Sequence, residues 1–179
     1  MKIETDRLIL SELTWNDLEA FHSFSSIPEI RRFSTIEIPE NVSASKDRLK
    51  SIIEQQTISP RKSYNWKVNL KNNKELLGLA GLNLSNDKFK LGEIFYEVHP
   101  ALWGNGYATE ITRNLIALGF EKFKLHKVEA GVATGNASSI RVLEKAGMKR
   151  EGLRRKILPI RGEWIDNYHY AIVEDDPRL

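Results

Sequence analysis

The sequence predicts an α+β fold in which helices cover both faces of one mixed, mostly antiparallel sheet. Two changes of hydrophobic pattern indicate it. Tyr64, Trp66 and Val68 alternate with polar residues, and this period of two is typical of strands. In the second half, apolar residues recur every three or four positions between extended runs, which indicates a strand–helix–strand unit with a parallel strand pair.

Length and composition bound the class of protein. The chain has 179 residues, which at roughly 100–200 residues per domain predicts one domain spanning residues 1–179. Lys and Arg total 27 against 24 Asp and Glu, so a net charge of +3 does not favour nucleic acid as a partner. The absence of Cys excludes disulfides and a cysteine nucleophile. The sequence has neither a long apolar run nor the apolar core of a signal peptide, so we expect a cytoplasmic protein with no membrane contact. We expect it to be a monomer or a homodimer.

The first third of the chain is expected to form one short strand and two helices. Leu8–Leu10 is the expected strand. Thr14 precedes apolar residues at helical spacing, and Asp17 stands where a capping box places an acidic side chain. Ser43 or Ser45 is expected to cap the second helix.

The middle of the chain is expected to form an antiparallel meander. Apolar alternation predicts strands over residues 64–70, 76–84 and 92–99. Turn residues at 72–73 and 86–87 separate these strands by short connections. Short connections join antiparallel neighbours, so the three strands should pair in sequence order.

The pattern in the second half of the chain predicts two helices, each preceded by a strand. A glycine-rich turn ends at Gly106, and an apolar helical stripe begins at Ala108. Asn136 is expected to cap the next helix, and Gly147 to close it. The remaining strands are predicted at residues 128–133, 148–158 and 164–173.

The turn between Pro100 and Glu110 is the most informative segment. Gly104 and Gly106 allow positive φ angles and a close approach of the backbone to a ligand. The first N–H groups of the following helix lack internal partners, and the helix dipole adds positive charge there. The segment therefore predicts an anion site suited to phosphate. A tight turn in which glycine only relieves strain is the alternative.

Two common phosphate-binding loops do not fit this turn. A P-loop needs Lys and then Ser or Thr after its last glycine, but Tyr107 and Ala108 follow here. A dinucleotide-binding turn needs a third glycine where Thr109 stands, and an acidic residue near the end of the next strand. That strand has Glu129 only in its interior.

Three segments carry a resemblance to a known family. The first segment, near the start of the chain, is Thr5–Leu10, and the third is Asn136–Met148. Between them, Gly106 and Ala108 match the last two positions of an acyl-CoA loop, whereas Trp103 stands where Arg or Gln is usual. Together they resemble the GNAT superfamily of acyl-CoA-dependent N-acyltransferases, and within it the RimJ/RimL branch of ribosomal-protein N-terminal acetyltransferases.

The resemblance implies a GNAT-like fold with a splayed parallel strand pair, and acetyl-CoA as the co-substrate. The CoA pyrophosphate would lie on the amides of the glycine turn, and the pantetheine would pair with a strand backbone. The implied reaction is acetyl transfer to a primary amine, on a protein N-terminus or a small molecule, by direct attack in a ternary complex. The implied cofactor-binding residues are Glu97, Val98, Trp103, Gly104, Asn105, Gly106, Tyr107, Ala108, Thr109, Asn136 and Arg141.

Two residues are candidates for the chemistry. Glu93 resembles the strand glutamate that some family members use as general base, directly or through water, and Glu97 is the second choice. A solvated or ion-paired strand glutamate is the alternative. Ser139 matches the serine that the RimJ/RimL branch places near the CoA sulfur, and Leu143 fills the position of the tyrosine acid of other members. A polar residue in a first helical turn is the alternative for Ser139.

Basic and aromatic side chains have two interpretations each. Arg141 either reaches a CoA phosphate or lies on a solvated helix face. A basic cluster either protects an exposed edge strand or contacts an anion.

The histidines have no metal-ligand spacing, so no metal is expected. The basic cluster consists of Arg154, Arg155, Lys156 and Arg161, and the aromatic residues that fit a core better than an acceptor pocket are Trp15, Phe33, Trp66 and Tyr96.

Two other functions compete with catalysis. A non-catalytic CoA-binding regulatory module is compatible with the same fold, since fold does not fix function. Leu143 favours this module, whereas Ser139 and Glu93 favour an enzyme. An RNA- or ribosome-binding protein would draw on the basic cluster, but the chain lacks an aromatic–basic recognition motif.

Overall fold

The computed structural model describes residues 1–85 and 88–177. The expected turn at residues 86–87 lies outside them. The strands are β1 (Lys2–Glu4), β2 (Leu8–Glu12), β3 (Ser63–Leu70), β4 (Leu76–Leu84), β5 (Leu91–Val98), β6 (Lys127–Ala133), β7 (Lys149–Ile160) and β8 (Glu163–Val173). The helices are α1 (Leu18–Ser25), α2 (Pro28–Arg31), α3 (Val42–Gln55), α4 (Tyr107–Glu121) and α5 (Ala137–Lys145).

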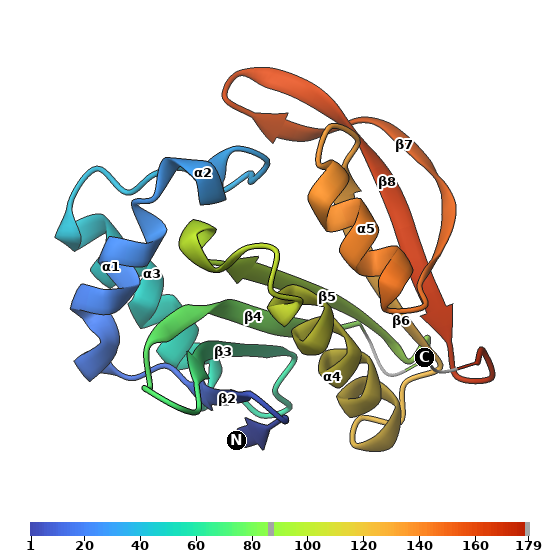
Figure 1. Cartoon of the computed structure of the whole chain (residues 1–179), viewed down its shortest axis with the longest axis horizontal. Helices are drawn as coiled ribbons and strands as arrows, with labels where there is room; N and C mark the ends of the chain where they lie inside the picture. Colours follow the sequence, from blue (N-terminus) through green and yellow to red (C-terminus); the bar gives the residue numbers. More distant parts are fainter. Residues whose placement is uncertain (86–87, 178–179) are drawn as a thin grey trace.

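The described strands form one mixed sheet in the order β1-β2-β3-β4-β5-β6-β8-β7 (Figure 1). Neighbouring strands are antiparallel except β5 and β6, which run parallel. The parallel register covers only Leu91–Glu93 of β5 and Lys127–Glu129 of β6. Beyond these residues the two strands splay apart. This sheet confirms the predicted fold class.

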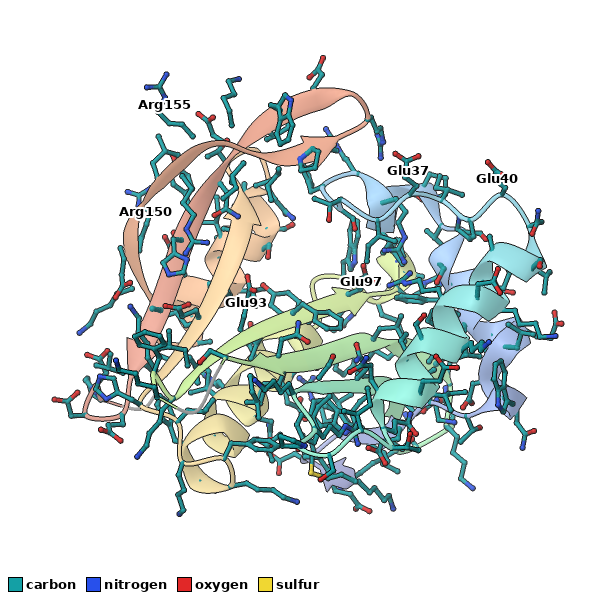
Figure 2. All side chains as sticks on the ribbon, turned by 180° about the vertical axis from the view of Figure 1, so that it is seen from behind. Glu37, Glu40, Glu93, Glu97, Arg150 and Arg155 are labelled. Atoms are coloured by element: carbon teal, nitrogen blue, oxygen red, sulfur yellow. The ribbon has the colours of Figure 1, made fainter. Side chains whose placement is uncertain are left out.

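Helices cover the two faces of the sheet, with α4 on one face and α3 on the other (Figures 1 and 2). On the first face, Ile111 and Leu115 of α4 belong to a buried cluster that includes Val68 of β3. On the second face, Leu49 of α3 packs in a smaller cluster with Leu79 of β4. Each such side chain contributes about 1.5–3 kcal/mol when fully buried. These two clusters hold the helices against the strands of the sheet, and the candidate active site lies at the ends of some of these strands.

The helix starts were predicted with mixed success. Asp17 accepts a hydrogen bond from the Thr14 N–H at 2.8 Å, as in a capping box, but the first turn is a 3₁₀ turn before α1. The predicted cap of α3 was wrong, because Asn41 caps this helix through its side-chain oxygen, 3.0 Å from the Ala44 nitrogen. Ser45 lies inside the helix, and its hydroxyl is occupied by the His22 ring at 2.8 Å.

Several local predictions were confirmed, and two elements were unforeseen. Asn136 caps α5 and accepts from the Ser139 N–H at 3.2 Å, and Gly147 follows the helix with φ of 89°. The short elements β1 and α2 were not expected. The basic cluster lies mainly on β7, the outer strand of the sheet, and Arg155 points away from the body of the molecule (Figure 2). None of the described helices is long and apolar enough to span a membrane.

Candidate active site

A cavity of about 510 Å³ opens where β5 and β6 splay apart. It extends from the end of β5 along the turn before α4 to the first turn of α5. All the predicted site residues line it except Asn105 and Glu93. The lining residues from the prediction are Glu97, Val98, Trp103, Gly104, Gly106, Tyr107, Ala108, Thr109, Asn136, Ser139 and Arg141.

The glycine turn adopts the backbone that the sequence predicted. Gly104 and Gly106 have φ angles of 83° and 78°, in the left-handed region that residues with a Cβ rarely adopt. Gly106 is also the N-cap of α4, and the first helical residues Tyr107, Ala108 and Thr109, whose N–H groups lack a partner within the helix, line the cavity. With the positive end of the helix dipole, these groups suit a phosphate.

The N-terminal segment holds this turn from outside the cavity. The Arg7 guanidinium donates to the Asn105 backbone oxygen at 3.0 Å and to the Glu110 carboxylate at 2.7 Å. Thr5 donates its hydroxyl hydrogen to the same carboxylate at 2.5 Å. Burial alone would raise the pKa of Glu110, but the hydrogen bonds from Thr5 and Arg7 outweigh burial and lower it. Thr5 and Arg7 therefore brace the Gly104–Gly106 turn, a role that was not predicted from the sequence.

Trp103 ties the turn to the end of β5. Its indole N–H donates to the Val98 backbone oxygen at 2.7 Å, while about half of the residue stays exposed. Val98 was expected to pair with pantetheine through its backbone; its carbonyl oxygen already accepts the Trp103 N–H, and a carbonyl oxygen has a second lone pair. Asn105 does not face the cavity, because its side-chain amide donates back to the Leu102 and Trp103 carbonyls.

Ser139 and Tyr96 meet inside the cavity. The two hydroxyl oxygens are 2.7 Å apart, and Tyr96 comes from β5 whereas Ser139 comes from the first turn of α5. Burial raises the pKa of Tyr96 to about 12, even though hydrogen bonds from Ser139 and Thr112 lower it. The phenol is therefore neutral at physiological pH. Leu143, in the position of the missing tyrosine acid, is buried in the core.

The two glutamates of β5 lie in different surroundings (Figure 2). Glu97 lines the cavity and forms a two-pronged ion pair with Arg31, with distances of 2.5 and 3.2 Å. Glu93 is exposed and lies outside the residues that line the cavity, at the last paired position of β5 and β6. The register between β4 and β5 runs without a bulge, so strand alternation holds.

The aromatic residues divide between core and cavity. Trp66 is fully buried, as expected for a core residue, but Phe33 and Tyr96 line the cavity. Trp15 was expected in the core and is about half exposed. Tyr96 packs against the core as well as lining the cavity, so its expected place is confirmed in part. Trp15 lies in a 3₁₀ turn and Phe33 in a turn, where no strand alternation indicates which side chains are buried.

Among the described residues, one group has the composition of a metal site. The ligand atoms of Glu129, Glu151 and His169 lie within 4.8 Å of one another. The Lys127 ammonium is 2.6 Å from Glu151 and 3.5 Å from Glu129, so a cation of the chain already balances these carboxylates. The group lies apart from the cavity lining.

Comparison with known proteins identifies the family. Residues 7–149 match the acetyltransferase (GNAT) domain, so the chain belongs to this family and is an acetyltransferase. It is 31% identical to the uncharacterized N-acetyltransferase YoaA of Bacillus subtilis, over 96% of each chain.

Solved structures agree with this assignment. A GNAT-family acetyltransferase from Bacillus anthracis superposes with a TM-score of 0.80 at 31% identity, over 98% of this chain and 99% of that one. A spermidine N-acetyltransferase from Vibrio cholerae, in complex with CoA and spermine, has a TM-score of 0.82 at 22% identity, over 96% and 98% of the chains. These matches establish the family and the fold and do not single out a branch such as RimJ/RimL.

Proposed function

We propose that this protein is an acetyl-CoA-dependent N-acetyltransferase that acetylates a primary amine by direct attack in a ternary complex. The observation that carries the proposal is the cavity at the splayed strands, which joins a helix N-terminus suited to phosphate to the Tyr96–Ser139 pair. The similar fold of a spermidine N-acetyltransferase in complex with CoA supports this choice of cofactor. The RimJ/RimL resemblance adds a protein N-terminus to the candidate acceptors.

The cofactor would lie along the cavity from α4 to α5. We place the pyrophosphate on the amides from Gly104 to Thr109, and the pantetheine beside the Glu97–Val98 backbone. Asn136 would contact the pantetheine in addition to capping α5, since its amide nitrogen is separate from the oxygen that caps. Arg141 lines the cavity next to Ser139 and would reach a phosphate.

Acetyl transfer consists of four changes. The amine nitrogen bonds to the thioester carbon, the carbon–sulfur bond breaks, the nitrogen loses a proton and the thiolate gains one. Glu97 is paired with Arg31, so we assign proton removal to Glu93, which lies outside the cavity lining and would act through a water that reaches the amine. Ser139 would assist the departing thiolate by hydrogen bonding, and Tyr96 would hold the Ser139 hydroxyl in place.

A thiol-release assay with acetyl-CoA tests the proposal over a panel of peptides, amino acids and polyamines. We expect CoA release that depends on one class of amine, with the acetylated amine identified by mass spectrometry. Stabilisation by acetyl-CoA without turnover of any amine would instead support the non-catalytic module. Comparison of peptide with free-amine substrates separates a protein N-terminus from a small-molecule acceptor.

A further inference from the structure

Two short segments hold six of the ten large apolar side chains that are exposed in the described part of the chain. One segment, residues 36–42, lies between α2 and the start of α3, and we call it the acidic segment. The other, residues 153–166, contains the turn between β7 and β8, and we call it the basic hairpin. Exposed apolar side chains that gather in this way mark surfaces that other molecules cover. The six side chains are Ile36, Ile38 and Val42 in the acidic segment and Leu153, Ile157 and Trp164 in the basic hairpin, and they are 39–59% exposed.

The two segments carry opposite charges. Glu37 and Glu40 are the only charged residues between positions 33 and 45. The basic hairpin has four basic residues, the cluster described above, against two acidic ones, Glu163 and Asp166. Asp166 is engaged within the hairpin, because it accepts the Lys156 N–H at 2.8 Å. One surface is therefore negative and apolar, and the other is positive and apolar.

Most of these charges have no partner of opposite sign in the described part of the chain. The side chains of Glu37 and Glu40 form no ion pair there, and neither do those of Arg155, Lys156 and Arg161. All five residues are exposed. They can therefore meet opposite charges on another molecule, and such complementary pairs select a partner and fix its orientation.

Both segments lie at the same end of the molecule (Figures 1 and 2). In Figure 2, Glu37, Glu40 and Arg155 point away from the body of the molecule at this end. A second copy related by a two-fold axis between the segments would present its basic hairpin to the acidic segment of the first copy, and its acidic segment to the hairpin of the first. A two-fold contact uses the same surface of both copies, so each complementary contact forms twice.

We propose that this chain forms a homodimer in which the basic hairpin of each copy lies on the acidic segment of the other. A nucleic acid would match only the basic hairpin, and would leave the acidic segment and the apolar side chains uncovered. A second copy supplies both the opposite charges and the apolar contacts that each segment needs. The inference does not depend on the proposed function, since no residue of either segment lines the candidate active-site cavity.

A charge swap tests the inference. Two variants each reverse the charges of one segment: Glu37→Lys with Glu40→Lys, and Arg155→Glu with Arg161→Glu. Each variant alone places like charges in both contacts, so we expect its dimer dissociation constant, measured by sedimentation, to rise about tenfold or more above that of wild type. In an equimolar mixture, one contact joins the two reversed segments and the other joins the two native ones. The mixture should therefore form a heterodimer about as tightly as wild type forms its homodimer.

A matched control and a second measurement accompany the swap. Lys122→Glu with Lys124→Glu makes the same change in net charge as the hairpin variant, but in the exposed turn after α4, at the opposite end of the molecule (Figure 1). Its dissociation constant should equal that of wild type, and melting temperatures check that every variant is folded. For wild type, the dissociation constant should rise with salt, because salt screens exposed charges.

The outcomes separate the possible partners. A wild-type protein that stays monomeric at every concentration, or a dimer that neither reversal weakens, overturns the inference. Variants that are weakened alone but do not associate in the mixture show that the two segments do not meet, and overturn it as well. A dimer whose dissociation constant is independent of salt contradicts the role of the charges. A monomeric wild type that binds RNA, with binding lost in the hairpin variant, would assign the basic hairpin to nucleic acid instead.

Discussion

Tyr96 and Ser139 join their hydroxyl groups at 2.7 Å across the cavity, although they are 43 residues apart in the chain. One comes from the splayed end of β5 and the other from the first turn of α5, so the bond connects the two walls of the proposed acetyl-CoA site. The pKa of Tyr96, raised to about 12 chiefly by burial, keeps the phenol protonated. A neutral phenol can hold the Ser139 hydroxyl in place but cannot serve as a base, and either hydroxyl can be the donor in this bond.

Removal of either hydroxyl should slow the chemical step. We expect Ser139→Ala to lower kcat by about 10²-fold or less, at the low end for general acid catalysis, because the thiolate is a fair leaving group. Tyr96→Phe should lower kcat by about 3- to 10-fold, the value of one hydrogen bond, with little change in the KM for acetyl-CoA. Steady-state kinetics check both variants.

The double variant is the sharper test of this pair. If Tyr96 acts through Ser139, the variant with both changes should be no slower than Ser139→Ala alone. Tyr170→Phe is a matched control, because Tyr170 also bonds to α5, through Glu144 at 2.9 Å, but lies outside the cavity lining. Fully multiplicative losses in the double variant would show that the two residues act independently.

The phosphate turn should not tolerate a side chain at Gly106. Its φ of 78° costs a residue with a Cβ about 1–2 kcal/mol, and a branched side chain would crowd a bound phosphate. We expect Gly106→Val to remain folded and to lose thermal stabilisation by acetyl-CoA. Gly152→Val is the control, since a Cβ there meets nothing within 4 Å. Unchanged stabilisation in folded Gly106→Val would rule out this phosphate site.

The brace formed by Arg7 and Glu110 should make stability depend on pH. The pKa of Glu110 is lowered below 4.5 in the folded state, so its contribution is complete above the unfolded value and is lost as pH falls through the folded value. Glu110→Gln should therefore cost about 1 kcal/mol of unfolding free energy at pH 7 and progressively less below about pH 4.5. Urea unfolding of both proteins across this range measures the difference; a cost that stays constant with pH would contradict the assignment.

The capping of α5 by Asn136 should be separable from the contribution of this residue to acetyl-CoA binding. Asn136→Ala removes the bond to the Ser139 N–H and should destabilise the protein by about 0.5–2 kcal/mol. Asn136→Asp keeps a capping oxygen but loses the amide donor. We expect it to retain the thermal stability of wild type while weakening acetyl-CoA binding, measured by calorimetry. Equal binding by Asn136→Asp and wild type would show that Asn136 only caps the helix.

Local signals in the sequence predicted the parts of the site that depend on nearby residues. The positive φ angles at Gly104 and Gly106 and the cap at Asn136 are set within a few residues, so composition and spacing identified them. The cap of α3 was misplaced, because Asn41, Ser43 and Ser45 are all good caps and packing decides among them.

The missed features are pairings between distant segments. Arg31 and Glu97 are 66 residues apart, and Arg7 and Glu110 are 103 residues apart. Strand alternation placed Glu97 on a face of β5, but no periodicity of one segment reveals which side chain of another segment will meet it. Only the assembled sheet shows that Glu97 is occupied by Arg31 and that Tyr96 reaches Ser139.

Initial velocities, measured while acetyl-CoA and an accepted amine are both varied, test the central claim most directly. The account predicts amine-dependent CoA release with double-reciprocal lines that intersect, because both substrates occupy the enzyme before the acetyl group moves. Parallel lines, which indicate an acetylated enzyme as an intermediate, would contradict direct transfer in this cavity. CoA release that no amine accelerates would contradict the assignment of the cavity to N-acetyl transfer.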